Sequence, residues 1–491
     1  MFLKKDPALI AAAFCLLAAS ASPLAAQSPP AASKAGAVRV TGSLRTRLEM
    51  WDWFEGSADN RYALSGNILR LSLAQTRGDF DWQLELAAPF LLGLPERAIG
   101  PAPQAQFGLG ATYFAANNGR QNAAMVFPKQ GFVRWRGLFG DKTQSLRVGR
   151  FEWMDGGEVA PKDPALAALK RDRVNQRLIG PFAWAHVGRS FDGFHYAVNR
   201  PKLNVTWVGA LATRGAFQVD GWGQLKTGFT TVSATGQTGS AKSAGEWRLS
   251  GIYFQDWRHV LKVDNRPLAA RQRDFGNIRL GTFTGHYMHN LQTRAGSFNA
   301  LVWAALQTGR WGVLDHRAGA VNIEGGWQPP GLKRLKPWLE GGFAHASGDK
   351  NPNDMRHGTF HQLLPTPRPF ARTPFYNMMN SDDFFAMLTV RPHQKVAVRS
   401  EYHAVRLAER NDLWYAGGGP FQPWTFGFAG RPTGGARSVA NLWDVSCDVN
   451  VNAHAAFTGY LGHMQGRAAV QRIYPQGGNG NFGYLEFTYR F

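Results

Sequence analysis

Arginine recurs at alternate positions in the segment VRVTGSLRTRLE (38–49). Arg39, Arg45 and Arg47 share one face of an extended chain with Glu49. An arginine side chain stays protonated and can donate two parallel hydrogen bonds to a carboxylate. Fixed positive charge with an interspersed acid holds anions without trapping them. The segment therefore predicts a surface over which anionic solutes move.

The elements that carry such residues are strands with two unlike faces. Apolar residues alternate with polar ones in five further segments, and the period of two is typical of strands. About sixteen to eighteen such segments, each about ten residues long, follow one another. The clearest are FDWQLELAAPF (80–90), LNVTWVGAL (203–211), KVAVRSEYHAV (395–405), WDVSCDVNV (443–451) and YLEFTYRF (484–491).

The charged face decides between a soluble and a membrane protein. The chain carries a formal charge of +21, and several charges fall on the polar face of single strands. Burying these ions in a dry core would cost several kcal/mol for each one. A water-filled lumen avoids that cost, while lipid receives the apolar face. We favour a membrane barrel over a large soluble all-β protein.

The spacing of the strands indicates the barrel type. Short turns, such as 76–79 and 199–202, alternate with long connections, as in an outer-membrane barrel. We predict an all-β fold: a single transmembrane antiparallel β-barrel over residues 37–491, of 18 strands within a range of 16–18. Its long loops are extracellular and its turns periplasmic. The expected long connections are 93–127, 154–188, 213–245, 258–273, 349–380 and 407–438.

The N-terminus has the pattern of a secretory signal peptide. Lys4 and Lys5 precede an apolar run, ALIAAAFCLLAA (8–19), and small residues follow it. We expect a signal peptide at 1–27 and a flexible lead-in at 28–36; an N-terminal anchor helix is the alternative. Removal of the signal leaves Cys447 as the single cysteine, so no intrachain disulfide is expected.

The C-terminal octet predicts how the barrel closes. Leu485, Phe487, Tyr489 and Phe491 should face lipid, and the strand should pair with residues 38–49. A final phenylalanine resembles the signal that the outer-membrane assembly machinery uses, so that machinery is an expected partner. The opposite face would then place Glu486 and Arg490 on the pore wall.

Several motifs, in conserved order along this chain, resemble the alginate export family of outer-membrane barrels. They are LRVGRFEWMDGGE (146–158), GRSFDGFHY (188–196), GTFHQLLPT (358–366) and VRSEYHAVRLAERNDLWYAGGG (398–419). The loop motif continues as PTPRPF (365–370), where the family more often has a polar residue or histidine. The resemblance implies a monomeric eighteen-stranded barrel with an arginine-lined lumen. It also implies passage of an anionic polysaccharide, or another anionic solute, across the outer membrane.

Strand parity and the family motifs together select the candidate lumen residues. In SLRVGRFEW (145–153), Arg147 shares parity with Phe151, so a β-bulge near Gly149 is needed to reset the register. The alternative for each residue is an ordinary solvated wall position with a cross-strand partner. The candidates for solute binding are Arg39, Arg45, Arg47, Arg70, Arg134, Arg136, Arg150, Glu152, Arg189, Asp192, Arg399, Glu401, Glu486 and Arg490.

Two loop segments and seven tryptophans have patterns that predict their positions in the barrel. DPALAALKRDRVNQR (163–177) has helical spacing and a basic end. It is either a surface loop, which we favour slightly, or a constriction folded into the pore. LLPTPRPFARTPFYNM (363–378) predicts a second ordered loop that would act as a lid. Interface girdles explain the tryptophans better than carbohydrate stacking does; they are Trp51, Trp53, Trp82, Trp135, Trp153, Trp184 and Trp207.

Enzymes, metal proteins and nucleic-acid binders fit less well. His286 and His289 would face opposite ways on a strand, and His357 and His361 have no acid at a ligand spacing. We expect no metal, no cofactor and no nucleic acid. The leading hypothesis is a non-enzymatic channel for passive export of an alginate-like polysaccharide, with lipid and a periplasmic export protein as partners. The alternatives are an anion or organic-acid porin for uptake and an outer-membrane hydrolase.

Overall fold

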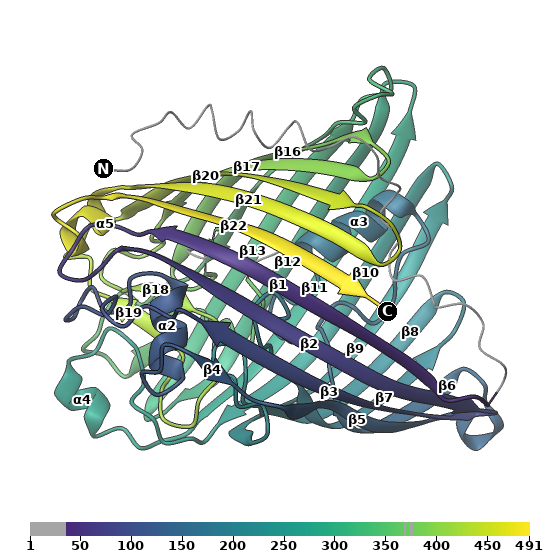
Figure 1. Cartoon of the computed structure of the whole chain (residues 1–491), viewed down its shortest axis with the longest axis horizontal. Coiled ribbons are helices and arrows are strands. Elements are labelled where there is room, and N and C mark those ends of the chain that lie inside the picture. Colours follow the sequence, from purple (N-terminus) through teal and green to yellow (C-terminus); the bar gives the residue numbers. More distant parts are fainter. Residues whose placement is uncertain (1–35, 368–369, 374–376) are drawn as a thin grey trace.

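The computed structural model describes residues 36–367, 370–373 and 377–491. The expected signal peptide and all of the lead-in except Gly36 lie outside the described residues. The described part is a closed barrel whose wall has eighteen antiparallel strands (Figure 1). The prediction of an eighteen-stranded barrel is therefore confirmed.

Each wall strand pairs with the next, and the last returns to the first. The wall consists of β1 (Arg39–Asp52), β2 (Arg61–Arg77), β3 (Phe80–Leu92), β5 (Phe127–Arg136), β6 (Gln144–Phe151), β7 (Phe191–Asn199), β8 (Leu203–Thr213), β9 (Gln224–Ser240), β10 (Ser243–Asp256), β11 (Ile278–Thr293), β12 (Gly296–Trp311), β13 (Leu314–Gln328), β14 (Trp338–Ala346), β16 (Ser381–His393), β17 (Val396–Arg406), β20 (Ser438–Asn450), β21 (Ala455–Gly466) and β22 (Asn479–Arg490).

Shorter elements lie in the connections. They are α2 (Leu109–Ala116), α3 (Pro164–Arg173), α4 (Leu268–Gln272), α5 (Ala468–Ile473), the 3₁₀ turn η1 (Leu138–Gly140), and the short strands β4 (Ala123–Ala124), β15 (Arg356–His357), β18 (Trp414–Gly417) and β19 (Phe428–Arg431). None of the helices in the described residues is both long and apolar enough to cross a membrane.

Barrel closure follows from the two terminal strands. β22 pairs with β1, as predicted, and the register of the two strands places Arg47 opposite Glu486. Gly42 and Phe491 exchange backbone hydrogen bonds of 2.8 and 3.0 Å. The tip of the Phe491 ring lies where a Cβ atom of Gly42 would be, so a larger residue at this position would displace the ring. Closure leaves no unpaired strand edge in the bilayer.

The two ends of the barrel differ. Long connections at one end run over 93–126, 152–190, 257–277, 347–380 and 407–437. Short turns such as 78–79 and 241–242 join the strands at the other end, where both β1 begins and β22 ends (Figure 1). By the usual orientation of outer-membrane barrels, the long-loop end is extracellular.

Two local expectations were wrong. The region 213–245 is not one long connection, because β9 occupies most of it. The pairing of β6 with β5 and β7 continues without a shift through Gly149, so no bulge resets the register there. The irregularity lies between β3 and β5 instead, opposite Glu85 and Leu86.

The outward face should tolerate no charge at mid-strand. Leu249 lies at the middle of β10 and is 66% exposed. Arginine at the bilayer midplane costs about 2–4 kcal/mol. We expect Leu249→Arg to lower the free energy of unfolding by that amount, as measured by urea unfolding in lipid vesicles. Leu268→Arg, in the exposed helix α4, is the control and should have little effect. Similar effects at the two positions would contradict the assignment of this face to lipid.

Candidate functional site

The connection from residue 152 to residue 190, here called the inner loop, folds into the barrel instead of covering it. Its helix α3 begins at Pro164, and the Asp163 carboxylate caps it by accepting from the Leu166 backbone N–H at 2.9 Å. Asn290, near the short-turn end of β11, also donates to this carboxylate at 3.2 Å. The inner loop therefore reaches far toward the periplasmic end, and the slight preference for a surface loop was wrong.

Buried ion pairs hold α3 against the wall. Lys170 Nζ lies 2.6 Å from Glu246 of β10, and Arg173 Nε lies 2.7 Å from Glu324 of β13. All four side chains are at most 3% exposed. Burial lowers the pKa of Lys170, and the Glu246 carboxylate opposes this shift. The basic end of the helix thus serves first to fix the loop.

The start of the inner loop is fixed in the same way. Arg248 of β10 donates to Asp155 at 2.8 Å and to Glu158 at 2.7 Å. One wall arginine therefore binds two loop carboxylates. Because Arg248 is occupied by these loop carboxylates, it is not available to bind solute.

The end of the inner loop is fixed to β1. Arg45 donates to the carbonyl oxygens of Ala183 and Ala185 at 2.7 and 2.5 Å. Arg47 donates to the carbonyl oxygen of Trp184 at 2.9 Å, and its guanidinium lies 4.5 Å from the Trp184 ring centre. Two predicted lumen arginines are thus inside the barrel, where they position this loop.

The connection 347–380 also enters the barrel and pairs with the inner loop. Leu364 exchanges backbone hydrogen bonds with Leu178 and Gly180, at 2.9 and 2.8 Å, and Thr366 donates to Gln176 at 3.0 Å. Leu364 is fully buried. This segment was expected to be a lid, and its described part lies beside the inner loop.

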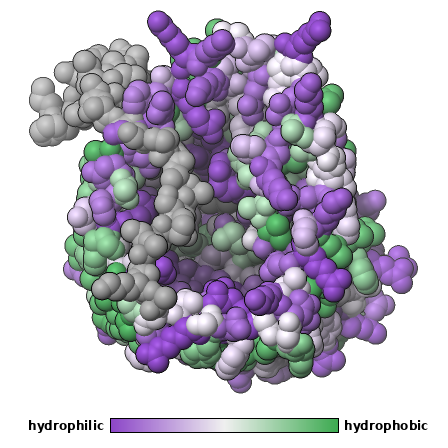
Figure 2. Space-filling model, turned by 90° about the vertical axis from the view of Figure 1, so that its right-hand side faces the viewer, coloured by the Kyte–Doolittle hydropathy of each residue, from purple (hydrophilic) through white to green (hydrophobic). Residues whose placement is uncertain are grey.

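These two loops leave a polar cavity of about 360 Å³ against the opposite wall. We call it the arginine passage. Figure 2 looks onto the short-turn end, where the barrel is hollowed and hydrophilic side chains surround the opening. The passage is lined by Arg47, Arg171, Asp172, Gln176, Ala183, Trp184, Thr366, Arg372, Arg399, Asp448, Thr458, Tyr484 and Glu486.

Four arginines and three acids line the passage. Arg47 lies 2.6 Å from Glu486, and Arg399 is paired with the buried Glu401. Arg171 is the most open of these four arginines, with 58% of its side chain exposed. Its Asp172 partner is only 2.8 Å away, so both signs are present at the surface of the passage. The arrangement suits brief contacts with an anion more than tight binding.

Other predicted lumen residues form a ladder of ion pairs along the wall. Arg70 lies 2.5 Å from Glu85 and 2.7 Å from Glu152. Arg134 is paired with Asp81. Arg136 donates to the carbonyl oxygen of Gly78 at 2.9 Å, close to the short-turn rim.

The two terminal strands place a further pair of predicted arginines at that rim. Arg39 lies at the start of β1 and lines a hollow with the 74–78 turn region. Arg490 lies at the end of β22, opposite Ser43 of β1, and is exposed. Both positions are on the inward parity of their strands.

Arg150 and Asp192 were placed wrongly. They form an ion pair of 2.6 Å, but they share the face of Val148 and Trp207, which are 41% and 48% exposed toward lipid. Because no bulge interrupts β6, the inward residue is Arg147, whose guanidinium lies 4.3 Å from the Phe151 ring centre. The outward pair lies where β6 ends and β7 begins, at the extracellular rim.

Arg189 has a different environment. It is 1% exposed, and one of its nitrogens donates to the carbonyl oxygen of Gly418 at 2.5 Å. Burial lowers its pKa to about 9, and the nearby Arg258 acts in the same direction. Arg189 therefore joins the inner loop to the connection 407–437 and does not line the arginine passage.

The girdle interpretation holds for part of the tryptophans. Trp135 and Trp207 are 41% and 48% exposed on the outer face. Trp51, Trp53 and Trp153 are buried inside, at 3–6% exposure. Trp51 stacks on Phe482 with ring centres 4.0 Å apart. The interior tryptophans fill the space between the wall and the loops.

Four charged passage residues were missing from the predicted set: Arg171, Asp172, Arg372 and Asp448. Asp448 lies on the polar face of the segment 443–451, so parity alone would have found it. Arg171 is in the basic end of the predicted helix. Arg372 has no periodic signal, since it lies in a loop, where it contacts Ser446 and lies 3.8 Å from Glu401. Within the described ranges, no group of three or more histidine, cysteine or acidic residues has the geometry to hold a metal ion.

The barrel and its lumen define an integral outer-membrane β-barrel channel. A family model described as alginate export matches residues 114–476. The chain belongs to the alginate export family.

Solved structures of other proteins show the same fold. The outer membrane protein opdK of Pseudomonas aeruginosa is 10% identical, with a TM-score of 0.52 over 92% of this chain and 99% of that one. OccK9 (OpdG) of the same organism has a TM-score of 0.55 at 10% identity, covering 92% and 98% of the two chains. OccAB2 of Acinetobacter baumannii has a TM-score of 0.54 at 10% identity, again covering 92% and 98%. A comparison with curated protein sequences found no match.

Breaking one buried anchor should loosen the inner loop. Glu324→Gln leaves Arg173 with an uncompensated buried charge, and such changes cost about 3–5 kcal/mol. We expect the free energy of unfolding to fall by this amount and protease cleavage within 152–190 to accelerate. Asp315→Asn, in the exposed pair with Arg310, is the control and should cost less than about 1 kcal/mol. Equal effects would show that the α3 anchor does not hold the loop.

Proposed function

We propose that this chain is a passive, anion-selective channel that exports an anionic polysaccharide of the alginate type across the outer membrane. The observation that carries the proposal is the arginine passage, which has four arginines on its surface next to three acids. Family membership supports a channel, and it favours this function over the outer-membrane hydrolase considered above. The proposed partners are lipid, the assembly machinery at Phe491 and a periplasmic protein that delivers the polymer.

A uronate polymer carries one carboxylate on each sugar, and the passage offers matching groups. Arg171 and Arg372 approach from the loops and Arg399 approaches from the wall. Arg47 is held by Glu486 and by the Trp184 carbonyl oxygen. A carboxylate could exchange one arginine for the next without ever losing a cationic partner. The interspersed Asp172 and Asp448 compete for the same guanidinium groups and would shorten each stay.

Uptake of small organic anions is the second candidate, and the size of the passage favours it. Buried ion pairs fix the inner loop, and the remaining cavity of about 360 Å³ lies within the range of small-molecule sites, about 300–1,000 Å³. A gene deletion separates the two candidates. Export predicts less extracellular polyuronate in the deletion strain, whereas uptake predicts slower growth on a small carboxylate and unchanged polyuronate.

Selectivity should depend on the loop arginines of the passage. A unit charge about 4 Å from a permeating anion contributes about 1 kcal/mol in water, or about fivefold in permeability. We expect Arg171→Gln and Arg372→Gln each to lower the anion-to-cation permeability ratio by about that factor. The measurement is the reversal potential of the purified channel in asymmetric salt.

A matched control separates this effect from a change in overall charge. Arg310→Gln removes an exposed cation at the extracellular end of β12 and should leave the permeability ratio unchanged. Cation preference in the unmodified channel, or equal shifts in all three variants, would contradict the proposal.

A further inference from the structure

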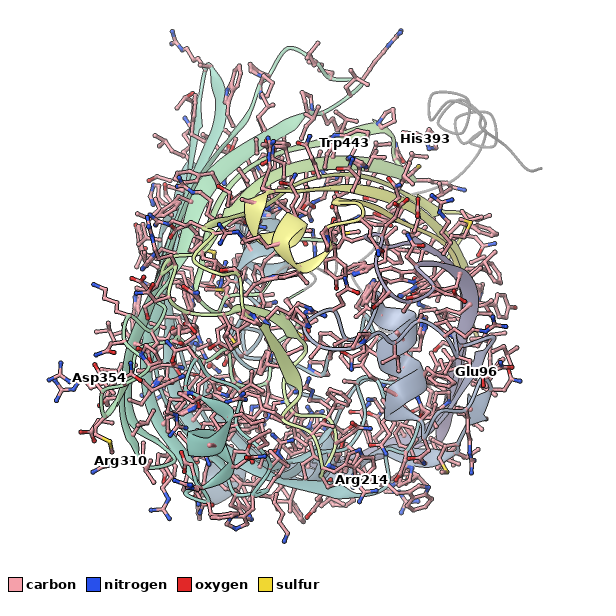
Figure 3. All side chains as sticks on the ribbon, turned by 90° about the vertical axis from the view of Figure 1, so that its left-hand side faces the viewer. Glu96, Arg214, Arg310, Asp354, His393 and Trp443 are labelled. Carbon is pink, nitrogen blue, oxygen red and sulfur yellow. The ribbon has the colours of Figure 1, made fainter. Side chains whose placement is uncertain are left out.

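A small polar cluster lies on the lipid-facing side of the wall, near the short-turn end of β10 and β11. Wall side chains point either into the ring of strands or away from it, as the view along the barrel shows (Figure 3). His286 of β11 points inward and lies 3.2 Å from the buried Glu246. His289 points the opposite way, as the spacing of the two histidines predicts. It shares the outer face with Phe283 and Leu291, which are 69% and 44% exposed.

Both ring nitrogens of His289 have a hydroxyl partner. The Nε2 atom lies 3.1 Å from the hydroxyl oxygen of Ser243, at the start of β10. The Nδ1 atom lies 3.1 Å from the hydroxyl oxygen of Tyr287. With the proton on Nδ1, the histidine donates to Tyr287 and accepts from Ser243. A serine hydroxyl, a histidine base and a third group that orients the histidine are the parts of a hydrolytic triad.

The cluster is accessible from the lipid side. Ser243 and His289 are partly exposed, and Tyr287 is 48% exposed. Gly245 lies opposite His289 in the register of β10 and β11. A Cβ atom at this position would lie 3.1 Å from the Tyr287 hydroxyl and 3.4 Å from His289 Nδ1. The glycine therefore leaves the space in which the two side chains meet.

The depth of the cluster corresponds to the periplasmic interface of the membrane. Tyr287 lies opposite Trp247, and Phe298 lies closer to the rim, with its ring centre 6.2 Å from that of Trp327. Tyrosine and tryptophan are enriched where lipid headgroups meet the acyl chains. The ester bonds of a phospholipid lie at the same level. The hydroxyl of Ser243 is thus placed beside the esters of the periplasmic leaflet.

Two exposed cations lie at the rim next to the cluster. Lys242 immediately precedes Ser243, and its carbonyl oxygen accepts from the Gln292 backbone N–H at 2.8 Å. Arg294 lies in the turn between β11 and β12. Positive charge at this level attracts the phosphate groups of lipids. These surroundings fit a phospholipid better than an uncharged ester.

We propose that this cluster is an ester-hydrolysing site for phospholipids of the periplasmic leaflet. Ser243 is the nucleophile, His289 is the base, and Tyr287 positions His289. The activity adds to the channel function and does not depend on it. The cluster lies on the outer face of the wall, whereas the arginine passage lies inside the barrel.

The reaction follows from these positions. Ser243 Oγ bonds to the ester carbonyl carbon while His289 Nε2 takes the hydroxyl proton. The carbonyl oxygen becomes an oxyanion, and the Lys242 ammonium supplies the positive charge beside it. The bond from the carbonyl carbon to the glycerol oxygen then breaks, and His289 gives its proton to that oxygen. Water attacks the acyl-serine by the same route, which releases the fatty acid and restores Ser243.

The test uses the purified full chain in vesicles of phosphatidylethanolamine and phosphatidylglycerol. A fluorophosphonate probe, which bonds to activated serines, should label Ser243, and mass spectrometry of the peptides locates the adduct. Released fatty acid is measured on the same vesicles. Ser243→Ala should abolish both signals and leave the single-channel conductance unchanged, because Ser243 lies outside the lumen.

Further variants separate the roles of the other residues. His289→Gln should slow labelling and fatty-acid release about a hundredfold or more, as expected for loss of a general base. Tyr287→Phe should lower kcat about tenfold with KM unchanged, because it removes one hydrogen bond to the histidine. Lys242→Gln should slow release about fivefold, the effect of a unit charge at about 4 Å in water. Ser240→Ala, across the same turn, is the control and should change neither signal.

Four results would overturn the proposal. The first two are no adduct on Ser243 and labelling of His289→Gln at the unmodified rate. Fatty-acid release that persists in Ser243→Ala would place the activity elsewhere. Cleavage of a soluble short-chain ester without release from the vesicles would exclude phospholipids as the substrate class. Should His289→Gln fail to fold, Tyr287→Phe decides, since an unchanged kcat would show that the histidine is not positioned for catalysis.

Discussion

The buried ion pairs between the inner loop and the wall are the constraint on which the lumen depends. Lys170 with Glu246, and Arg173 with Glu324, place four charges out of water. Such pairs contribute little net stability, but losing one partner leaves an uncompensated charge. The main effect of these ion pairs is therefore to keep the inner loop in one position against the wall. With the loop fixed on β10 and β13, the open space is restricted to the opposite wall, next to β1, β17 and β20–β22.

This arrangement assigns the arginines of the lumen to two tasks. Arg45 and Arg248 fix the inner loop. Arg45 donates hydrogen bonds to backbone carbonyl oxygens of the loop, and Arg248 pairs with loop carboxylates. Arg171 and Arg372 are carried by the loops to the surface of the passage. Total basic charge in the sequence thus overstates the charge that a solute meets. The proposed anion selectivity rests on a small surplus of cations over acids, which favours fast passage over tight binding.

The sequence predicted what local periodicity controls. A strand has a period of two, so the inward positions of Arg47 and Glu486 follow from alternation. The pairing of β1 with β22 follows from closure of the barrel. The predicted inward positions of Arg150 and Asp192 were wrong because the expected bulge at Gly149 is absent, while a register shift occurs between β3 and β5. The position of Arg372 depends on how two loops pair inside the barrel. Its neighbours in space come from distant segments, which no local pattern reports.

The accessibility of residue 171 to charged thiol reagents tests the central claim, that a fixed inner loop narrows the lumen to a basic passage. In a Cys447→Ala background, Arg171→Cys would be modified during single-channel recording by anionic or cationic methanethiosulfonates. We predict that the anionic reagent reacts faster than the cationic one and that modification blocks most of the single-channel current. An unchanged current, or faster reaction with the cationic reagent, would contradict the account.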